Sequence, residues 1–158
     1  MEQLVDSNSK KLGLEEIVKI AAANTKSEYS FNQVFMSIMK ELTLKGSIVI
    51  QIGNTIYVMH RASKNPYYAV MRALNADTAQ NYLTNSEQFA KMAYDKYNVD
   101  VIVSQYTDPT LNKIFEYVGR NKPANMGFNI VKAKDGKSFL ATAKLGPPRG
   151  ETQPKGNI

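Results

Sequence analysis

Apolar residues in the first third of the chain recur at the spacing of a helix. The stretch Leu12–Asn24 places its apolar residues three or four positions apart, which predicts a helix with one buried stripe. The stretch Ser30–Leu44 repeats this spacing. Ser30 and Gln33 stand three residues apart, as the two partners of a capping box do, so we expect the second helix to begin at Ser30.

The pattern then changes to alternation, which predicts strands. Ser47–Ile52 and Thr55–Arg61 flank Gly53-Asn54, a pair typical of a tight hairpin turn, and Tyr67–Leu74 is a third strand. The remaining expected elements are a helix in one or two pieces over Asp77–Tyr97 with Asp77 as its cap, a strand buried on both faces over Val99–Tyr106, a helix over Asp108–Gly119, and strands over Phe128–Ala133 and Ser138–Leu145 around Asp135-Gly136.

This order predicts a mixed α/β fold. With a short strand before the first helix it reads (β)ααβββαβαββ, which implies a mixed central sheet with helices on both faces. We expect residues 1–11 to form an arm or a short edge strand and residues 12–145 the folded domain. Residues 146–158 are rich in Pro and Gly, so we expect an extended tail.

Composition excludes several classes of protein. A hydrophobic content of 43% and a charged content of 22% are ordinary for a globular domain, and apolar runs are too short for a membrane span. The first residues lack the pattern of a secretion signal, so we expect no such signal. The chain has no Cys and one His, which excludes disulfides and thiolate chemistry, and we expect no metal site.

The net charge of +6 is a mild basic excess. Lys and Arg are scattered, and no block of five or six like charges occurs. A solvated basic surface explains this distribution. A surface that contacts nucleic acid or another polyanion is the alternative, because net charge steers partners without specifying them.

The segment Asp108–Gly119, DPTLNKIFEYVG, resembles the last-helix motif of the Gcn5-related N-acetyltransferase (GNAT) family. That motif often reads Asn-x-x-Ala-x-x-Leu-Tyr-Glu-Lys-Leu-Gly-Phe. Asp108 takes the Asn place and Leu111 the Ala place, while Ile114 and Gly119 take the places of the first Leu and of Gly. With the element order, the resemblance covers about residues 3–145. It implies a GNAT-like fold and, as the family's activity, acetyl transfer from acetyl-coenzyme A to an amine.

The same motif departs from the family at its proton donor. The family's Tyr often protonates the coenzyme thiolate as it leaves, and Phe115 occupies that place here. A phenyl ring has no ionisable proton, so Phe115 cannot be a general acid. Tyr117, the remaining candidate if the chain is active, lies about 200° further around the helix.

The second departure is in the loop that holds the coenzyme's pyrophosphate. The family uses a glycine-rich loop whose backbone N–H groups cradle the anion, but the window Asn75–Ser86 contains no glycine. Asp77 adds a negative charge near the expected start of the helix. If coenzyme A binds, the resemblance assigns its contacts to the following residues: Met71, Arg72, Ala73, Gln80 and Asn81.

A third departure is the missing general base. The family often carries a Glu on the strand before this loop, whereas Arg72 is the only charged residue of Tyr67–Leu74. We expect Arg72 to face solvent or a partner, with a ligand as the alternative. His60 has no triad spacing around it, so we expect a surface histidine.

These losses favour a non-catalytic protein that keeps the acetyltransferase fold as a scaffold for binding and needs no cofactor. Small proteins similar to acetyltransferases but lacking their motifs occur among tailed-bacteriophage proteins. The resemblance therefore implies a virion or assembly component, located in the virion or host cytoplasm, whose termini contact neighbouring protein subunits. Two alternatives stay open: a divergent acetyl-coenzyme A-dependent N-acetyltransferase, and a basic inhibitor that binds nucleic acid or a host factor.

Overall fold

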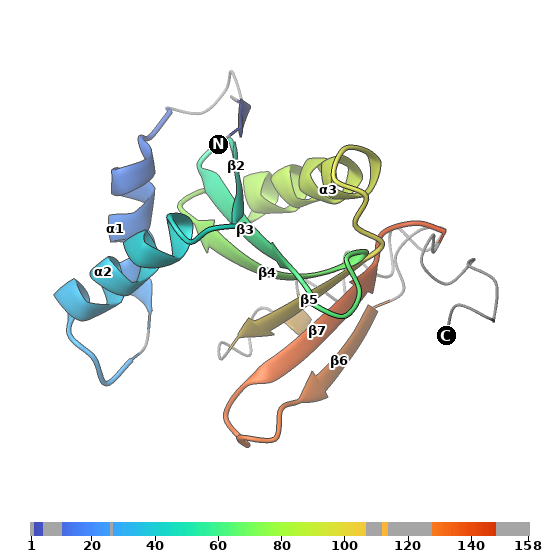
Figure 1. The fold of residues 1–158 in the computed structure, drawn as a ribbon. Coiled ribbons are helices and arrows are strands. Elements are labelled where there is room, and N and C mark those ends of the chain that lie inside the picture. The colour runs from blue at the N-terminus through green and yellow to red at the C-terminus, as the bar shows by residue number, and fades with distance from the viewer. Residues whose placement is uncertain (1, 5–10, 26, 107–111, 114–127, 148–158) are drawn as a thin grey trace. The chain divides into compact units, whose positions relative to one another are not determined.

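Within the described residues, helices and strands follow one another along the chain in the predicted order. The computed structural model describes residues 2–4, 11–25, 27–106, 112–113 and 128–147 (Figure 1). The elements are β1 (Glu2–Leu4), α1 (Leu14–Asn24), α2 (Phe31–Leu42), β2 (Ile48–Ile52), β3 (Thr55–Arg61), β4 (Tyr68–Asn75), α3 (Ala79–Asp95), β5 (Val101–Tyr106), β6 (Phe128–Lys132) and β7 (Phe139–Lys144). The mixed α/β fold class predicted from the sequence is confirmed.

The chain divides into two compact units. The first unit comprises Met1–His60 and Arg72–Phe89, and the second comprises Arg61–Met71 and Ala90–Ile158. The division runs through β4 and α3, so each of these elements contributes one part to each unit. The three predicted segments, 1–11, 12–145 and 146–158, follow a different division and stay a prediction.

The β2–β3 hairpin is the central part of the sheet in the first unit. The two strands pair antiparallel, and Ile52 opposes Thr55 across the predicted Gly53-Asn54 turn. Gly53 has a φ of +56°, which a residue without a Cβ adopts at little cost. β1 pairs parallel with β2, with Glu2 opposite Ile50, so the expected short strand before the first helix is present.

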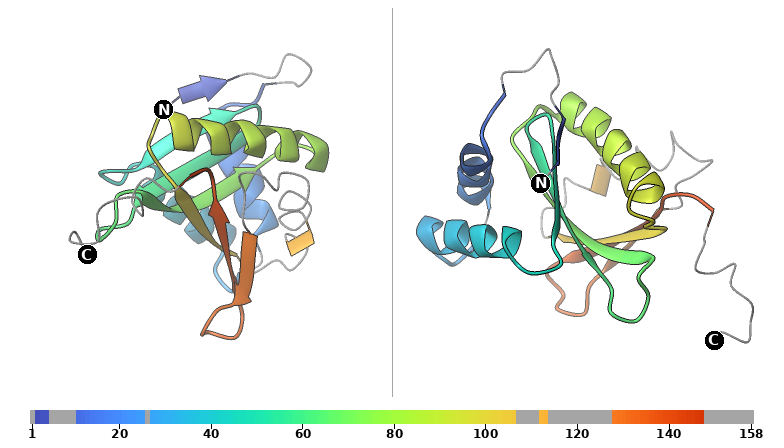
Figure 2. Two further views of the ribbon diagram at one scale, coloured as in Figure 1. Left: turned by 90° about the vertical axis from the view of Figure 1, so that its right-hand side faces the viewer. Right: turned by 45° about the horizontal axis from the view of Figure 1, so that its top comes forward.

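Helices cover both faces of the sheet in the first unit (Figure 2). On one face α1 and α2 pack on β3 and β4 through a cluster of buried apolar side chains: Ile17, Val18, Ala22, Ile38, Ile56, Val58 and Leu74. On the other face Tyr57 of β3 stacks on Phe89 of α3, with ring centroids 4.2 Å apart. Tyr57 stands between Ile56 and Val58, so the alternation of the strand sends its side chain to the opposite face.

The second unit mixes parallel and antiparallel pairing. Tyr68 of β4 lies opposite Val101 of β5 in parallel register, while β7 pairs antiparallel with both β5 and β6. The buried residues include Ala69, Val101, Ile102 and Ala141. Gln105 near the end of β5 is exposed, so the burial predicted for the whole of Val99–Tyr106 is right only for its first half.

The structure differs from the prediction at the start of α3, and it describes little of the last predicted helix. The stretch Asp77–Tyr97 forms one helix, α3, and its cap is Thr78, whose Oγ1 accepts a hydrogen bond from the Asn81 N–H at 3.2 Å. Asp77 is not the cap, because its carboxylate is engaged elsewhere. The helix predicted over Asp108–Gly119 lies outside the described residues, except that Asn112 and Lys113 are helical.

Candidate ligand-binding pocket

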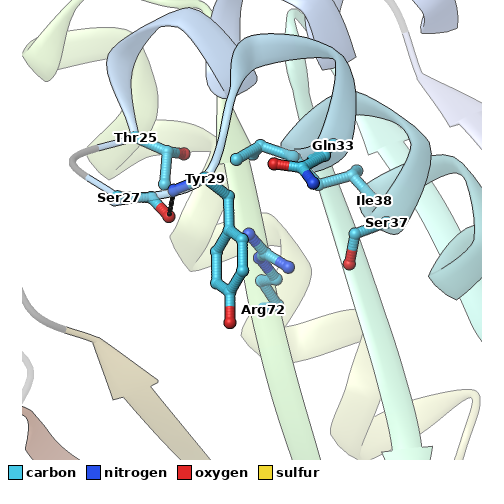
Figure 3. A pocket seen from close by; sticks show the side chains of 8 residues that line it. Thr25, Ser27, Tyr29, Gln33, Ser37, Ile38 and Arg72 are labelled. Carbon is cyan, nitrogen blue, oxygen red and sulfur yellow. Dashed lines mark hydrogen bonds between the residues drawn. The ribbon is translucent and has the colours of Figure 1, made fainter.

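A pocket of about 440 Å³ opens in the first unit where the α1–α2 connection and α2 face Arg72 of β4 (Figure 3). Most of its lining side chains are polar. The described residues that line it are Thr25, Ser27, Tyr29, Gln33, Val34, Ser37, Ile38 and Arg72. Buried Ile38 gives the pocket an apolar base, while the hydroxyl, amide and guanidinium groups provide hydrogen-bonding capacity.

The predicted capping box holds the first turn of α2 at this pocket. The Gln33 N–H donates to Ser30 Oγ at 3.2 Å, and the Ser30 N–H donates to Gln33 Oε1 at 2.9 Å. Both contacts confirm the expectation from the spacing of the two residues. The box uses one lone pair of Gln33 Oε1, and the side-chain NH2 of this residue adds two hydrogen-bond donors at the pocket.

Local hydrogen bonds also shape the connection between α1 and α2. Thr25 Oγ1 donates a hydrogen bond to the Ala21 carbonyl oxygen at 2.7 Å, which holds the Thr25 side chain against the last turn of α1. Ser27 Oγ accepts a hydrogen bond from the Tyr29 N–H at 3.1 Å, which is drawn in Figure 3. The hydroxyl proton of Thr25 and one lone pair of Ser27 Oγ are therefore already engaged in hydrogen bonds within the protein.

Among the described residues that line the pocket, Arg72 is the only charged one. It lines the pocket together with Tyr29 and Ser37 (Figure 3), and its Nη1 donates to Glu41 Oε2 at 2.9 Å. The sequence led us to expect Arg72 in solvent or at a partner surface. The structure places it at the pocket with its side chain 40% exposed and ion-paired, because α2 brings Glu41 beside β4, and its contact with a partner or a ligand stays a prediction.

Glu41 was missed by sequence reasoning. It supplies a carboxylate next to β4, a strand that contains none of its own. The two partners are 31 residues apart, so no local spacing could have indicated the pair. Chemically, the carboxylate fixes the orientation of the guanidinium and neutralises part of its charge.

The β4–α3 loop, where the family's glycine-rich cradle is expected, is held by side chains. Asp77 Oδ2 accepts hydrogen bonds from the Asn54 N–H at 2.7 Å and from Asn85 Nδ2 at 2.8 Å. Asn75 Oδ1 accepts from the Asp77 N–H and from Thr55 Oγ1, both at 2.9 Å. This polar cluster of five residues ties the loop to the β2–β3 turn and to α3.

The polar cluster changes the interpretation of this loop. Asp77 directs its carboxylate to Asn54 and Asn85, and these neutral N–H donors leave the negative charge that the sequence predicted near the helix start in place. In addition, the Asp77 and Asn81 backbone N–H groups are already bound by the side chains of Asn75 and Thr78. The residues present therefore do not fit a backbone cradle for a pyrophosphate.

The other predicted coenzyme contacts are spread over both units. Met71, in the second unit, is half-buried, and its carbonyl oxygen accepts a hydrogen bond from Ser104 Oγ at 3.0 Å. The β4–β5 pairing ends just before, at Val70 opposite Val103. In the first unit, Ala73 and Asn81 are half-buried and Gln80 is exposed. Within the first unit only Arg72 of the five predicted residues lines the pocket.

Two buried tyrosines of the first unit are Tyr57 of β3 and Tyr82 of α3. Burial raises the pKa of Tyr82 to about 12. Burial also raises the pKa of Tyr57 well above 10, with a further rise from Tyr82. Tyr57 Oη lies 2.8 Å from Ser86 Oγ, and its ring stacks on Phe89. Both phenols are therefore neutral at physiological pH and serve as buried hydrogen-bonding groups.

His60 is half-buried, whereas the sequence predicted a surface position. Its Nδ1 lies 3.4 Å from Ser47 Oγ. The Ser47 hydroxyl donates to the Glu41 carbonyl oxygen at 3.1 Å, so this proton is already committed to a backbone acceptor. The geometry does not describe a serine nucleophile activated by histidine.

Some predicted site residues cannot be placed. Phe115 and Tyr117, together with the rest of the family motif except Asn112 and Lys113, lie outside the described residues. Within the described part of the chain, no group of three acidic or His side chains could hold a metal ion. None of the helices described there is long and apolar enough to cross a membrane.

Comparisons with known proteins give matches at the level of structure alone. No family model matches the chain, and no curated protein matches it in sequence. An uncharacterized protein from Bacillus halodurans superposes with a TM-score of 0.55 at 7% identity over 85% of this chain and 82% of that one. A putative acetyltransferase from Salmonella typhimurium, solved with its cofactor acetyl-CoA, gives 0.51 at 12% identity over 85% and 90%. At these identities the matches concern the fold.

Proposed function

We propose that this chain, which has the GNAT fold, is a non-catalytic binding protein whose ligand site is the Arg72 pocket. The element order and the structural similarity to the putative acetyltransferase of Salmonella typhimurium support this fold. Fold alone does not carry activity, because sites change while scaffolds persist. The function therefore depends on the residues of the β4–α3 loop and of the Arg72 pocket.

The polar cluster at the β4–α3 loop is the observation that carries this proposal. A pyrophosphate site at a helix start needs backbone N–H groups that point at the anion and can be approached closely. Here Asn75 and Thr78 accept hydrogen bonds from the Asp77 and Asn81 N–H groups. The window contains no glycine, so each of its residues carries a Cβ that limits close approach to the backbone. These features support the proposal that the coenzyme does not bind at this loop.

The pocket supports a binding role on its own terms. It has a volume of about 440 Å³, within the range of small-molecule sites, and combines an apolar base with polar groups around it. A place in a phage particle, with the termini against neighbouring subunits, remains a prediction from the resemblance. Binding of nucleic acid by the basic surface also remains a prediction.

A divergent acetyl-coenzyme A-dependent N-acetyltransferase is the second candidate. The ion pair of Glu41 with Arg72 favours it, because it brings a carboxylate to the strand on which the family often carries its base. Such an enzyme would need a pyrophosphate site other than the usual cradle. Met71, Ala73, Gln80 and Asn81 remain the residues that the resemblance assigns to the coenzyme in this case.

Calorimetric titration of the whole chain with acetyl-coenzyme A tests the proposal. We expect no saturable heat and no rise in melting temperature. Saturable binding in the micromolar range or tighter would overturn the non-catalytic proposal and favour the second candidate. Any binding could be located with Gln80→Glu, which adds a negative charge in the first turn of α3. Gln88→Glu, an equally exposed position later in the same helix, is the matched control.

A further inference from the structure

We infer that the Arg72 pocket binds the oxyanion of a small molecule, a carboxylate or a phosphate group. This inference deepens the proposed function and rests on its use of the pocket as a ligand site. Its basis is the positive charge of Arg72 and the hydrogen-bond donors of the other lining residues. These residues belong to α2, to the α1–α2 connection and to β4.

Donors dominate the polar groups that a ligand would meet. A guanidinium carries five N–H donors and no acceptor, and Arg72 directs one nitrogen, Nη1, to Glu41. The capping box uses one lone pair of Gln33 Oε1, and the NH2 group of this amide adds two donors for a ligand. Ser37 adds a hydroxyl from the next turn of α2.

Charge decides which ligand group fits this pocket, because the lining hydroxyl groups can both donate and accept hydrogen bonds. None of the eight described lining residues is acidic. Arg72 is the charged residue among them, and Glu41 offsets part of its charge from outside the lining. A ligand group rich in lone pairs and negative in charge complements this set, whereas an ammonium group would meet like charge.

The guanidinium is held in place before a ligand arrives. Glu41 binds it from the α2 side, which lowers the entropy that a ligand must spend on ordering the side chain. The pocket also lies at the first turns of α2, whose N-terminal end carries partial positive charge. Val34 and Ile38 give the ligand an apolar surface beside its anionic group.

The test is a nuclear magnetic resonance titration of the full chain with sodium acetate and, separately, with inorganic phosphate, at constant ionic strength against sodium chloride. We expect saturable shifts of the Gln33 side-chain NH2 and the Arg72 Nε–H signals with at least one of the two probes. The probe that binds more tightly identifies the carboxylate or the phosphate as the natural group. The absence of saturable shifts with both probes would overturn the inference.

Three variants make the assignment specific. Loss of one charged hydrogen-bond partner is expected to weaken binding by about tenfold or more in Arg72→Gln. Lys40→Gln removes the same charge from an exposed site on α2 that does not line the pocket, and we expect a change below about twofold there. Glu41→Gln keeps a side-chain oxygen that can accept from Arg72 Nη1 and orient the guanidinium, but it removes the negative charge that repels an anion, so binding should tighten. Equal weakening in Arg72→Gln and Lys40→Gln would show unspecific attraction and refute the site.

This experiment separates two failures. A tight complex with acetyl-coenzyme A in the calorimetric titration would refute the non-catalytic proposal, whatever the small anions do. Loss of the anion response with no coenzyme binding would refute the ligand class alone. Spectra of each variant without probe report whether the fold of the first unit is intact.

Discussion

The Arg72 guanidinium of β4 and the Glu41 carboxylate of α2 lie 2.9 Å apart, although 31 residues separate them in the chain. Their side chains are 40% and 24% exposed, so water screens part of the attraction. The pair fixes the orientation of Arg72, the one cation among the described residues that line the pocket. The ion pair therefore matters mainly because it positions the guanidinium, and it contributes little to the free energy of unfolding.

Replacing Glu41 with Gln should therefore lower the free energy of unfolding by no more than about 1 kcal/mol, the range of partly exposed ion pairs. Urea denaturation at neutral pH measures this difference. Glu15→Gln is the control, because Glu15 forms an exposed pair with Lys19 at 3.7 Å and should change stability even less. A loss of about 3 kcal/mol or more would mean that the Glu41 pair is effectively buried.

Gly53→Ala should destabilise the chain more than an ordinary turn substitution. The φ of Gly53 is +56°, which costs a residue with a Cβ about 1–2 kcal/mol. The added Cβ would also lie 3.0 Å from both Asp77 Oδ2 and Asn85 Nδ2, atoms that the polar cluster holds in place. We therefore expect a greater loss than the backbone cost alone.

Gly46→Ala is the matched control for this prediction. Gly46 also has a positive φ, +87°, but an added Cβ would meet nothing within 4 Å. The difference between the two variants in urea denaturation isolates the effect of the polar cluster. Equal losses would contradict the close packing of the hairpin turn against Asp77 and Asn85.

Stability should fall in alkaline solution as the buried tyrosines ionise. The pKa of Tyr82 is about 12 in the folded chain against 10.0 as its ordinary value. A pKa raised by folding contributes stability that is complete below pH 10 and is lost as the pH rises towards 12. Tyr57, whose pKa is raised as well, adds to the same loss.

Tyr82→Phe should make this loss shallower, because one of the two groups that resist ionisation is removed. Urea denaturation at a series of alkaline pH values measures the slope. Ultraviolet absorbance of tyrosinate, compared between the native chain and Tyr82→Phe, reports the pKa of Tyr82 directly. A midpoint near 10 in the difference titration would contradict the burial of this side chain.

Local signals in the sequence predicted much of the fold. The capping box of Ser30 and Gln33 and the hairpin turn at Gly53-Asn54 depend on residues only a few positions apart, and both are present. The alternation of Ile56, Tyr57 and Val58 similarly decides which side chains face α1 and α2 and which faces α3. The cap of α3 was misplaced because Asp77 has partners distant in sequence, which outweigh its local preference.

The candidate site was predicted only in part. The missing glycines in the window Asn75–Ser86 and the single charge on β4 are properties of the sequence. What fills the place of the glycines was not predictable, since Asn54, Asp77 and Asn85 meet only when the hairpin, the loop and α3 come together. The expectations for Phe115 and Tyr117 remain predictions, because both lie outside the described residues.

The sequence by itself determined the elements, their order and the chemistry that the coenzyme loop lacks. These follow from hydrogen bonds and side-chain periodicity within a few residues, which the unfolded chain already encodes. Tertiary structure decided that Arg72 faces a pocket, that Glu41 orients it and that Asp77 is turned into the polar cluster. Such contacts join positions 23 and 31 residues apart, and packing of helices on strands, not local preference, brings them within hydrogen-bond distance.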